Sequence, residues 1–232
     1  MEITKDLQYA LGTSIYLIPN FITKTQCGLI KNYLIKSKEE NLKPLWLLSN
    51  SSTSSYLTKL SFLNDLVNNV KECEDLETCI TNKIKQILGE DCIQDNELVI
   101  KIENFWYNIQ TKNSSLAIHR HQSTDFACAL YINVDEYSSN IYFDSYLSYQ
   151  NFLLCDAIIA DGNNRPYNFI VDQHSKYANG ENFIHGYKRL GIHPQIGDLL
   201  IFPAYLYHHS GRQLNMTDDR IVISMNVNIY KA

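Results

Sequence analysis

The spacing of hydrophobic positions changes near residue 98 of this 232-residue chain. Before that point apolar residues recur three and four positions apart, which predicts amphipathic helices. One helix is expected from Thr23, a suitable N-cap, to about Leu34, and two more over 59–89, ended by Gly89. These helices carry no catalytic signature, so we expect them to buttress a sheet.

The segments before and between these helices are predicted to form a short strand and two connections. A strand closed by Pro19 is expected within 8–20, and a polar connection over 36–43. The Ser/Thr-rich stretch 49–55 is typical of a surface loop.

After residue 98 the chain becomes rich in aromatic and β-branched residues with a period of two, which predicts strands. They are expected over 98–109, 115–121, 126–134, 141–144, 199–203 and 220–230. Helices followed by many short strands predict an α+β chain whose second part is an antiparallel β-barrel or sandwich.

The length fits one domain over 1–232, because β sandwiches of this size commonly form a single core. Residues 1–97 then form a mainly helical support, and residues 98–232 form the catalytic β core. A Tyr- and Asn-rich insertion at about 145–190 interrupts that core. Long insertions between core strands are often lids or binding loops.

Composition limits the class of protein. The net charge of −5, with no basic stripe, argues against a general nucleic-acid binder. No apolar run is long enough to span a membrane. None of the six cysteines forms a C-x-x-C pair, and the polar N-terminus lacks a signal-peptide pattern. We therefore expect reduced thiols in an intracellular, cytoplasmic protein. The sequence leaves the oligomeric state open between a monomer and a homodimer.

The clearest chemical feature is the pair His119 and His121. Residues i and i+2 of a strand point to the same face, so both rings can reach one point. Two neutral nitrogen ligands on one face suit iron, zinc or copper. His208, after a strand and a turn, is the best third ligand, and the adjacent His209 competes for this role.

Arg220 is the second notable residue, because an arginine among Ile and Val is costly to bury unpaired. Its planar guanidinium suits a carboxylate, and Ser224 shares the same strand face and can donate to the same anion. A surface arginine at the end of a strand is the alternative.

These residues form a recognisable string: His-x-His, Gly-Asp-Leu-Leu-Ile-Phe-Pro-x-x-x-x-His, then Arg-x-x-x-Ser-x-Asn. The string resembles the 2-oxoglutarate- and Fe(II)-dependent oxygenases, most of all the branch in phages and marine bacteria with a His-x-His motif. That branch has a Trp-x-Asn strand before its first histidine, here Trp106-Tyr107-Asn108. The resemblance covers about residues 98–230 without the insertion.

The resemblance implies a double-stranded β-helix (jelly-roll) core and Fe(II) held by His119, His121 and His208. It implies that Arg220 pairs with the distal carboxylate of the cosubstrate 2-oxoglutarate. The further residues that it implies at the cosubstrate pocket are Ser224, Asn108, Tyr107 and Tyr131. Oxidation of the cosubstrate by O2 to succinate and CO2 would be coupled to hydroxylation of a C–H bond in a peptide, an amino acid or a small metabolite.

One position departs from the family pattern. Most of the superfamily has Asp or Glu where this chain has His121. Three histidines can hold the metal, which is the favoured interpretation. Alternatively Asp125 supplies the carboxylate through a bulge, or His121 is the first ligand and Ser123 stands in the acid position.

Two other functions remain open at this level. A three-histidine, cupin-type dioxygenase would not use 2-oxoglutarate and would have no need for Arg220. A jelly-roll binding protein without catalysis would not need three well-placed histidines.

Overall fold

The structure is a computed structural model that describes residues 15–40, 46–47, 53–58, 61–91, 98–144, 189–213 and 217–231. The predicted insertion at 145–190 lies outside the described residues, apart from its last two positions.

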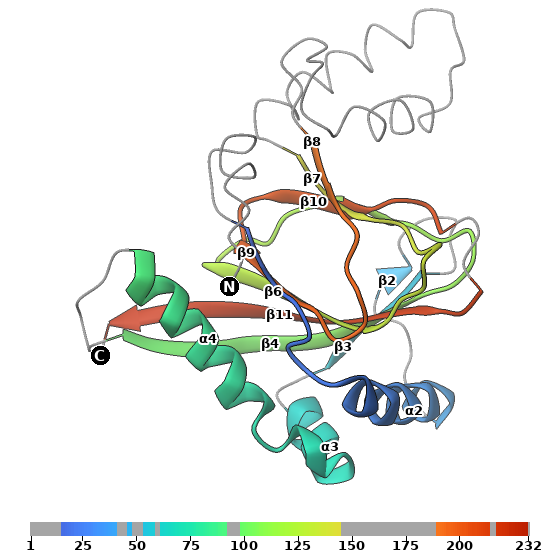
Figure 1. Cartoon of the computed structure of the whole chain (residues 1–232), viewed down its shortest axis with the longest axis horizontal. Helices are drawn as coiled ribbons and strands as arrows, with labels where there is room; N and C mark the ends of the chain where they lie inside the picture. Colours follow the sequence, from blue (N-terminus) through green and yellow to red (C-terminus); the bar gives the residue numbers. More distant parts are fainter. Residues whose placement is uncertain are drawn as a thin grey trace, which may run out of the picture.

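Two antiparallel sheets face each other (Figure 1). The larger sheet has the strand order β1 (Tyr16–Ile18), β9 (Leu199–Pro203), β6 (Phe126–Asn133), β11 (Arg220–Lys231), β4 (Leu98–Gln110), β3 (Thr53–Thr58) and β2 (Trp46–Leu47). The smaller sheet has the order β5 (Leu116–His119), β10 (Tyr207–Ser210), β7 (Ile141–Asp144) and β8 (Arg189–Ile192). The non-sequential strand order is that of a jelly roll and agrees with the predicted antiparallel sandwich.

The helices lie along the outer face of the larger sheet, beneath β4, β6 and β11 (Figure 1). They are α2 (Lys24–Glu40), α3 (Ser61–Asn69), the 3-10 turn η1 (Lys71–Cys73) and α4 (Leu76–Asp91). Their apolar stripes pack on one face of the sheet and exclude water there, as the expected buttress does. The buried residues on the two sides include Ile30, Leu34, Leu66, Ile80 and Ile84 of the helices and Phe105, Tyr107 and Ile109 of β4.

Strand alternation gives β4 two different faces. Phe105, Tyr107 and Ile109 pack towards the helices, whereas Trp106 and Asn108 face the space between the sheets. A second apolar cluster fills part of that space, with Phe202 and Val222 from the larger sheet and Phe143 from the smaller. The polar inner positions of β4 and β11 therefore stand beside an apolar core.

The first helix begins as predicted. Thr23 Oγ1 accepts a hydrogen bond from the Gln26 backbone N–H at 3.2 Å, and Gln26 Oε1 accepts one from the Thr23 N–H at 2.9 Å. This reciprocal pair is a capping box. The helix continues to Glu40, through part of the predicted polar connection, because nothing in Lys36–Glu40 breaks a helix.

Two predicted loops are instead strands. Residues 53–58 overlap the end of the surface loop expected at 49–55. They form β3, which pairs with β4 in the register Thr53↔Gln110 to Thr58↔Phe105. His208, expected in a loop, lies in β10 between β5 and β7. Both strands are short, and their hydrogen bonds come from partners distant in the sequence, so local pattern carries little signal for them.

The turn at Gly197-Asp198 joins several segments of the chain. Gly197 donates to the Tyr131 carbonyl at 2.8 Å, and Tyr131 donates to the Asp198 carbonyl at 2.9 Å. The Asp198 carboxylate accepts from the backbone N–H groups of Asn20 and Gln195. The turn therefore fixes Tyr131 on β6 and the chain after β1.

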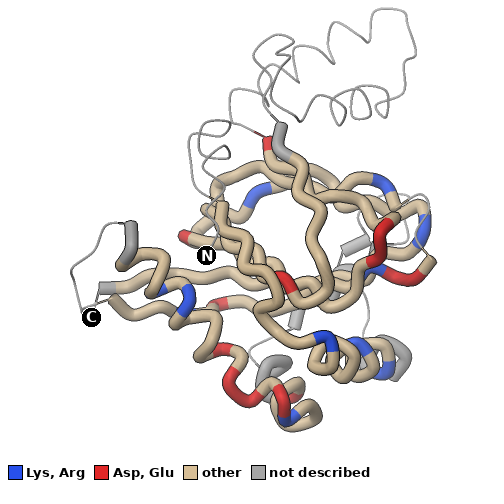
Figure 2. Tube along the Cα trace, viewed as in Figure 1, with Lys and Arg blue, Asp and Glu red and all other residues tan. Residues whose placement is uncertain are grey.

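Most of the charged residues lie on the helices and in the loops (Figure 2). Acidic residues concentrate around η1, where Glu72, Glu74, Asp75 and Glu77 are exposed. Lys31 of α2 forms an ion pair with Asp218, just before β11. Among the described helices, none has both the length and the apolar character needed to cross a bilayer.

Replacement of Gly197 tests the importance of the turn. Gly197 has φ +90°, and an added Cβ would collide with the carbonyl oxygen of Ile22. We expect Gly197→Ala to lower the free energy of unfolding by about 1–3 kcal/mol, because an L residue is strained there. Chemical denaturation measures the change, and Gly28→Ala, at an open helical position, is the control. Equal stability of Gly197→Ala and wild type would contradict the assigned strain.

Candidate metal and cosubstrate site

Cross-strand pairing in the smaller sheet brings two histidines together. His119 is the last residue of β5, and His208 of β10 lies directly opposite it. Their ring centroids are 4.2 Å apart. Residues separated by 89 positions in the chain thus share one face of one sheet.

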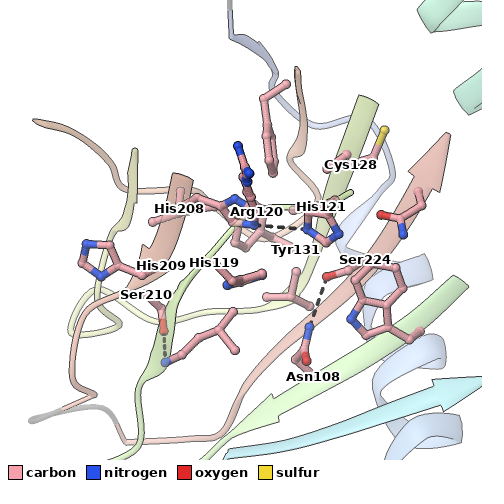
Figure 3. A pocket seen from close by; sticks show the side chains of 18 of the residues that line it. Asn108, His119, Arg120, His121, Cys128, Tyr131, His208, His209, Ser210 and Ser224 are labelled. Atoms are coloured by element: carbon pink, nitrogen blue, oxygen red, sulfur yellow. Dashed lines mark hydrogen bonds between the residues drawn. The ribbon is translucent and has the colours of Figure 1, made fainter. Parts of the chain in front are cut away.

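His121 joins them from just beyond the end of β5. Its backbone N–H donates to the Ala204 carbonyl at 2.9 Å, which holds this segment against the turn before β10. The His121 and His208 rings are stacked with centroids 5.1 Å apart, and their Nε2 atoms are 3.3 Å apart. Figure 3 shows the three rings turned towards one another at one side of the pocket.

Backbone carbonyls orient two of the rings. His119 Nδ1 bonds the Ala117 carbonyl at 2.8 Å, and His208 Nδ1 bonds the Leu206 carbonyl at 2.9 Å. A proton on Nδ1 leaves the Nε2 lone pair available, which is the usual way in which proteins prepare a histidine for metal binding.

The cluster has the dimensions of a metal site. One nitrogen from each of His119, His121 and His208 lies within 4.8 Å of the others. Two ligands at ~2.1 Å from one ion and at right angles are separated by about 3 Å, close to the observed Nε2–Nε2 distance. The donor set, three imidazole nitrogens, fits a first-row divalent ion such as Fe(II).

Burial keeps these rings neutral, as metal ligands must be. It lowers the pKa of His121 to about 4, with a further contribution from His119, and lowers the pKa of His119 and of His208. Because the neutral form offers a lone pair, protons do not compete with a metal at neutral pH.

The other candidate ligands lie elsewhere. The Asp125 carboxylate accepts a hydrogen bond from the Ile229 N–H at 2.8 Å, at the edge of β11. Ser123 is exposed. His209 stacks on Tyr142 and lies 3.6 Å from the Asp144 carboxylate, and its ring points away from the three histidines (Figure 3). In the described part of the chain, no carboxylate joins the histidine cluster.

Arg220 is buried at the start of β11, with 4% of its surface exposed. Its Nη1 donates to Gln110 Oε1, and its guanidinium lies over the Tyr131 ring, 5.2 Å from the centroid. Its Nε has no hydrogen-bond partner among the described residues. Burial lowers the pKa of Arg220 from a high starting value, and the group stays charged at neutral pH.

A cavity of about 540 Å³ connects the arginine and the histidines. Asn108, Tyr131 and Ser224 line it, and Asn108 Nδ2 donates to Ser224 Oγ at 3.1 Å (Figure 3). Tyr107 packs in the core towards the helices instead. Along β4 the inner-facing residues become more exposed from Gln110 through Asn108 and Trp106 to Asn104. The arginine therefore lies at the inner end and Asn104 at the outer end.

Two residues of this site carry no sequence signal of their own. Gln110 bonds Arg220, and Ser210 bonds Gln110. A glutamine at the end of a strand and a serine after a His-His pair are common in any sequence. The only indication is the alternation of side chains along a strand, because Gln110 lies two positions after Asn108 and therefore shares its strand face.

Comparisons with known proteins agree with this geometry. A family model described as a 2OG-Fe(II) oxygenase matches residues 104–226, more than half of the chain. The match includes the three histidines and Arg220. No curated protein sequence matches the chain significantly.

Solved structures share the fold at low sequence identity. A prolyl-4-hydroxylase from Pseudomonas putida is 9% identical, with TM-score 0.53 and coverage of 96% of this chain and 95% of that one. HygX from Streptomyces hygroscopicus, solved with nickel and 2-oxoglutarate, is 14% identical, with TM-score 0.53 and coverage of 98% and 87%. The 2-oxoglutarate-dependent epimerase SnoN of nogalamycin biosynthesis is 12% identical, with TM-score 0.57 and coverage of 97% and 83%.

These likenesses confirm the predicted double-stranded β-helix core with its helical support. Together with the family match across the histidine and arginine strands, they lead to one conclusion: the chain belongs to the 2OG-Fe(II) oxygenase family and is an Fe(II)- and 2-oxoglutarate-dependent oxygenase.

Proposed function

We propose that this oxygenase hydroxylates a C–H bond of a peptide, an amino acid or a small metabolite. In this proposal His119, His121 and His208 hold Fe(II), and Arg220 binds the distal carboxylate of 2-oxoglutarate. The observation that carries it is a buried arginine that no carboxylate of the described chain neutralises, across one cavity from three converging imidazoles.

An unneutralised guanidinium in such a place favours an anionic ligand. A buried charge without a partner costs several kcal/mol, and a carboxylate that binds it relieves this cost. Nε is a donor that still lacks an acceptor in the described structure, and Ser224 Oγ and the Tyr131 hydroxyl line the same cavity. A carboxylate can accept several such hydrogen bonds at once.

In this proposal the histidines and Arg220 have separate roles, set by their places in the cavity. When bound, Fe(II) supplies the oxidising chemistry in which O2 and 2-oxoglutarate give succinate, CO2 and one oxygen atom for the substrate. The three imidazoles would hold the metal with Nε2, and the Ala117 and Leu206 carbonyls fix two of the rings. Arg220 places the 2-oxo acid end of the cosubstrate towards the histidines.

A cupin-type dioxygenase with three histidines would share the metal cluster but would leave Arg220 without a purpose. The cost of burying Arg220 therefore favours the enzyme that uses 2-oxoglutarate. A non-catalytic binding protein is disfavoured by the carbonyl bonds that prepare His119 and His208 as ligands.

The substrate would enter at the outer end of the cavity. Trp106 lies there, with its ring 5.6 Å from that of His121, and Asn226 pairs with Asn104 across β11 and β4. Asn226 Oδ1 is buried and accepts no hydrogen bond from a described residue. This end suits a substrate that donates an N–H or O–H to Asn226 beside an apolar or flat group on Trp106.

We also infer that the protein works inside the cell, in the cytoplasm. The four cysteines in the described part of the chain, Cys27, Cys73, Cys79 and Cys128, are free thiols. Free buried cysteines are typical of a reducing compartment. The expected partners are the substrate and O2, without nucleic acid.

Metal binding tests the ligand set. Trp106 is close enough to the cluster for anaerobic Fe(II) to quench its fluorescence. We expect His121→Ala and His208→Ala to weaken metal binding by at least about 100-fold, because each removes a direct ligand. Asp125→Asn should bind as tightly as wild type. An equal loss in Asp125→Asn would instead place the carboxylate at the metal.

Cosubstrate binding tests Arg220. Anaerobic Fe(II) and 2-oxoglutarate together should give a weak visible band. Arg220→Ala should abolish it at cosubstrate concentrations that saturate wild type, since a charge-assisted hydrogen-bond pair of about 3 kcal/mol is lost. Arg212→Ala, at an exposed position, is the control. A normal band in Arg220→Ala would refute the assigned role.

Turnover tests the substrate end. Candidate peptides and amino acids are screened for stimulation of succinate formation above the uncoupled rate. For any stimulating compound, Asn226→Leu should raise its KM about tenfold, the effect of one lost hydrogen bond at a buried site, and leave uncoupled succinate formation unchanged. An unchanged KM would remove Asn226 from the substrate site.

A further inference from the structure

Gln110 occupies an unusual position between the two halves of the site. It ends β4 and is 1% exposed, and both ends of its amide are engaged. Oε1 accepts from Arg220 Nη1, and Nε2 donates to Ser210 Oγ at 2.5 Å. Arginine has only donors, so the amide oxygen must face Arg220 and the amide nitrogen must face Ser210.

Ser210 connects this amide to the strands that carry the histidines. It lies on β10 two residues after His208, and its Oγ also accepts from the Leu116 N–H at 2.8 Å. Leu116 begins β5, the strand that ends at His119. Gln110 therefore links Arg220 of the larger sheet to β10 through Ser210, and to β5 through the hydrogen bond that Ser210 accepts from Leu116.

The chemical identity of residue 110 matters as much as its position. A glutamine accepts from the guanidinium but is neutral, so the positive charge of Arg220 stays available to a ligand. A glutamate of the same size would form an ion pair with Arg220 and cancel that charge. None of the described acidic residues lines the cavity, so nothing there substitutes for a bound anion.

We propose that Gln110 is the positioning residue that makes the site selective for a dicarboxylate 2-oxo acid. It holds the guanidinium at a fixed separation from the histidines and leaves its charge unneutralised. A cosubstrate of matching length then reaches both ends, whereas a monocarboxylate engages only the metal end. The inference rests on the proposed roles of Arg220 and the histidines and adds the origin of the selectivity.

Gln110→Glu tests the inference, because it changes charge without changing size. We expect 2-oxoglutarate binding to the Fe(II) protein, measured by the visible band under anaerobic conditions, to weaken about 10- to 100-fold. Binding of the monocarboxylate pyruvate should change less than twofold, so the preference for 2-oxoglutarate over pyruvate collapses. Fe(II) quenching of Trp106 should match wild type. A merely structural defect would weaken both 2-oxo acids and the metal together.

Gln213→Glu is the matched control. Gln213 is fully buried and is not one of the residues that line the cavity, and its amide donates to Ser139 Oγ and the Gly211 carbonyl. The Gln213→Glu variant carries the general cost of a buried carboxylate and should keep the preference for 2-oxoglutarate over pyruvate. If Gln213→Glu loses that preference as Gln110→Glu does, the inference fails.

Gln110→Met covers the case in which Gln110→Glu does not fold. Methionine keeps the charge of Arg220 but removes both hydrogen bonds. We expect the discrimination of 2-oxoglutarate from 2-oxoadipate, one methylene longer, to shrink at least about threefold. Unchanged discrimination would overturn the positioning role.

Arg220→Ala separates this inference from the proposed function. If Arg220→Ala loses 2-oxoglutarate binding and Gln110→Glu keeps it, Gln110 has no role in selection and the proposed function stands. If Arg220→Ala itself binds 2-oxoglutarate normally, the proposed function fails first.

Discussion

The antiparallel pairing of β5 with β10 is the constraint on which the site depends. It sets His119 opposite His208 and, through Ser210 and Leu116, anchors the same two strands to Gln110. The larger sheet contributes the other half of the cavity, because β11 lies between β4 and β6 and carries Arg220 inward. The helices on the outer face allow this sheet to present an apolar surface on one side and polar residues on the other. The candidate metal site and the candidate anion site are thus consequences of how two sheets face each other.

The sequence is informative where function is concentrated in few positions. The His-x-His spacing, the Gly-Asp block before His208 and the serine four residues after Arg220 are short-range patterns, and residues of this kind can be found without a fold. The spacing of apolar residues also changes near residue 98, from three or four positions to two. This change separates the helical part from the β-rich part, because helices and strands each have a characteristic spacing of apolar residues.

The strands and site residues that the sequence did not predict depend on contacts between residues distant in the sequence. The strand at 53–58 exists because β4 offers it hydrogen bonds, and β10 because β5 and β7 flank it. Gln110 and Ser210 meet across 100 positions. Tyr107 stands next to Asn108 in the motif, yet neighbouring strand residues point to opposite faces, and only the register decides which of the two faces the cavity.

The graded exposure along β4 gives the pocket a direction. The Arg220 end is enclosed, and the described lining opens towards Asn104. A ligand that binds Arg220, as we propose for 2-oxoglutarate, would therefore arrive before anything that occupies the space around Trp106 and would leave after it. In the proposed function, the shape of this strand face implies an order of addition in which the cosubstrate would bind first and succinate would leave after the outer end of the cavity has emptied.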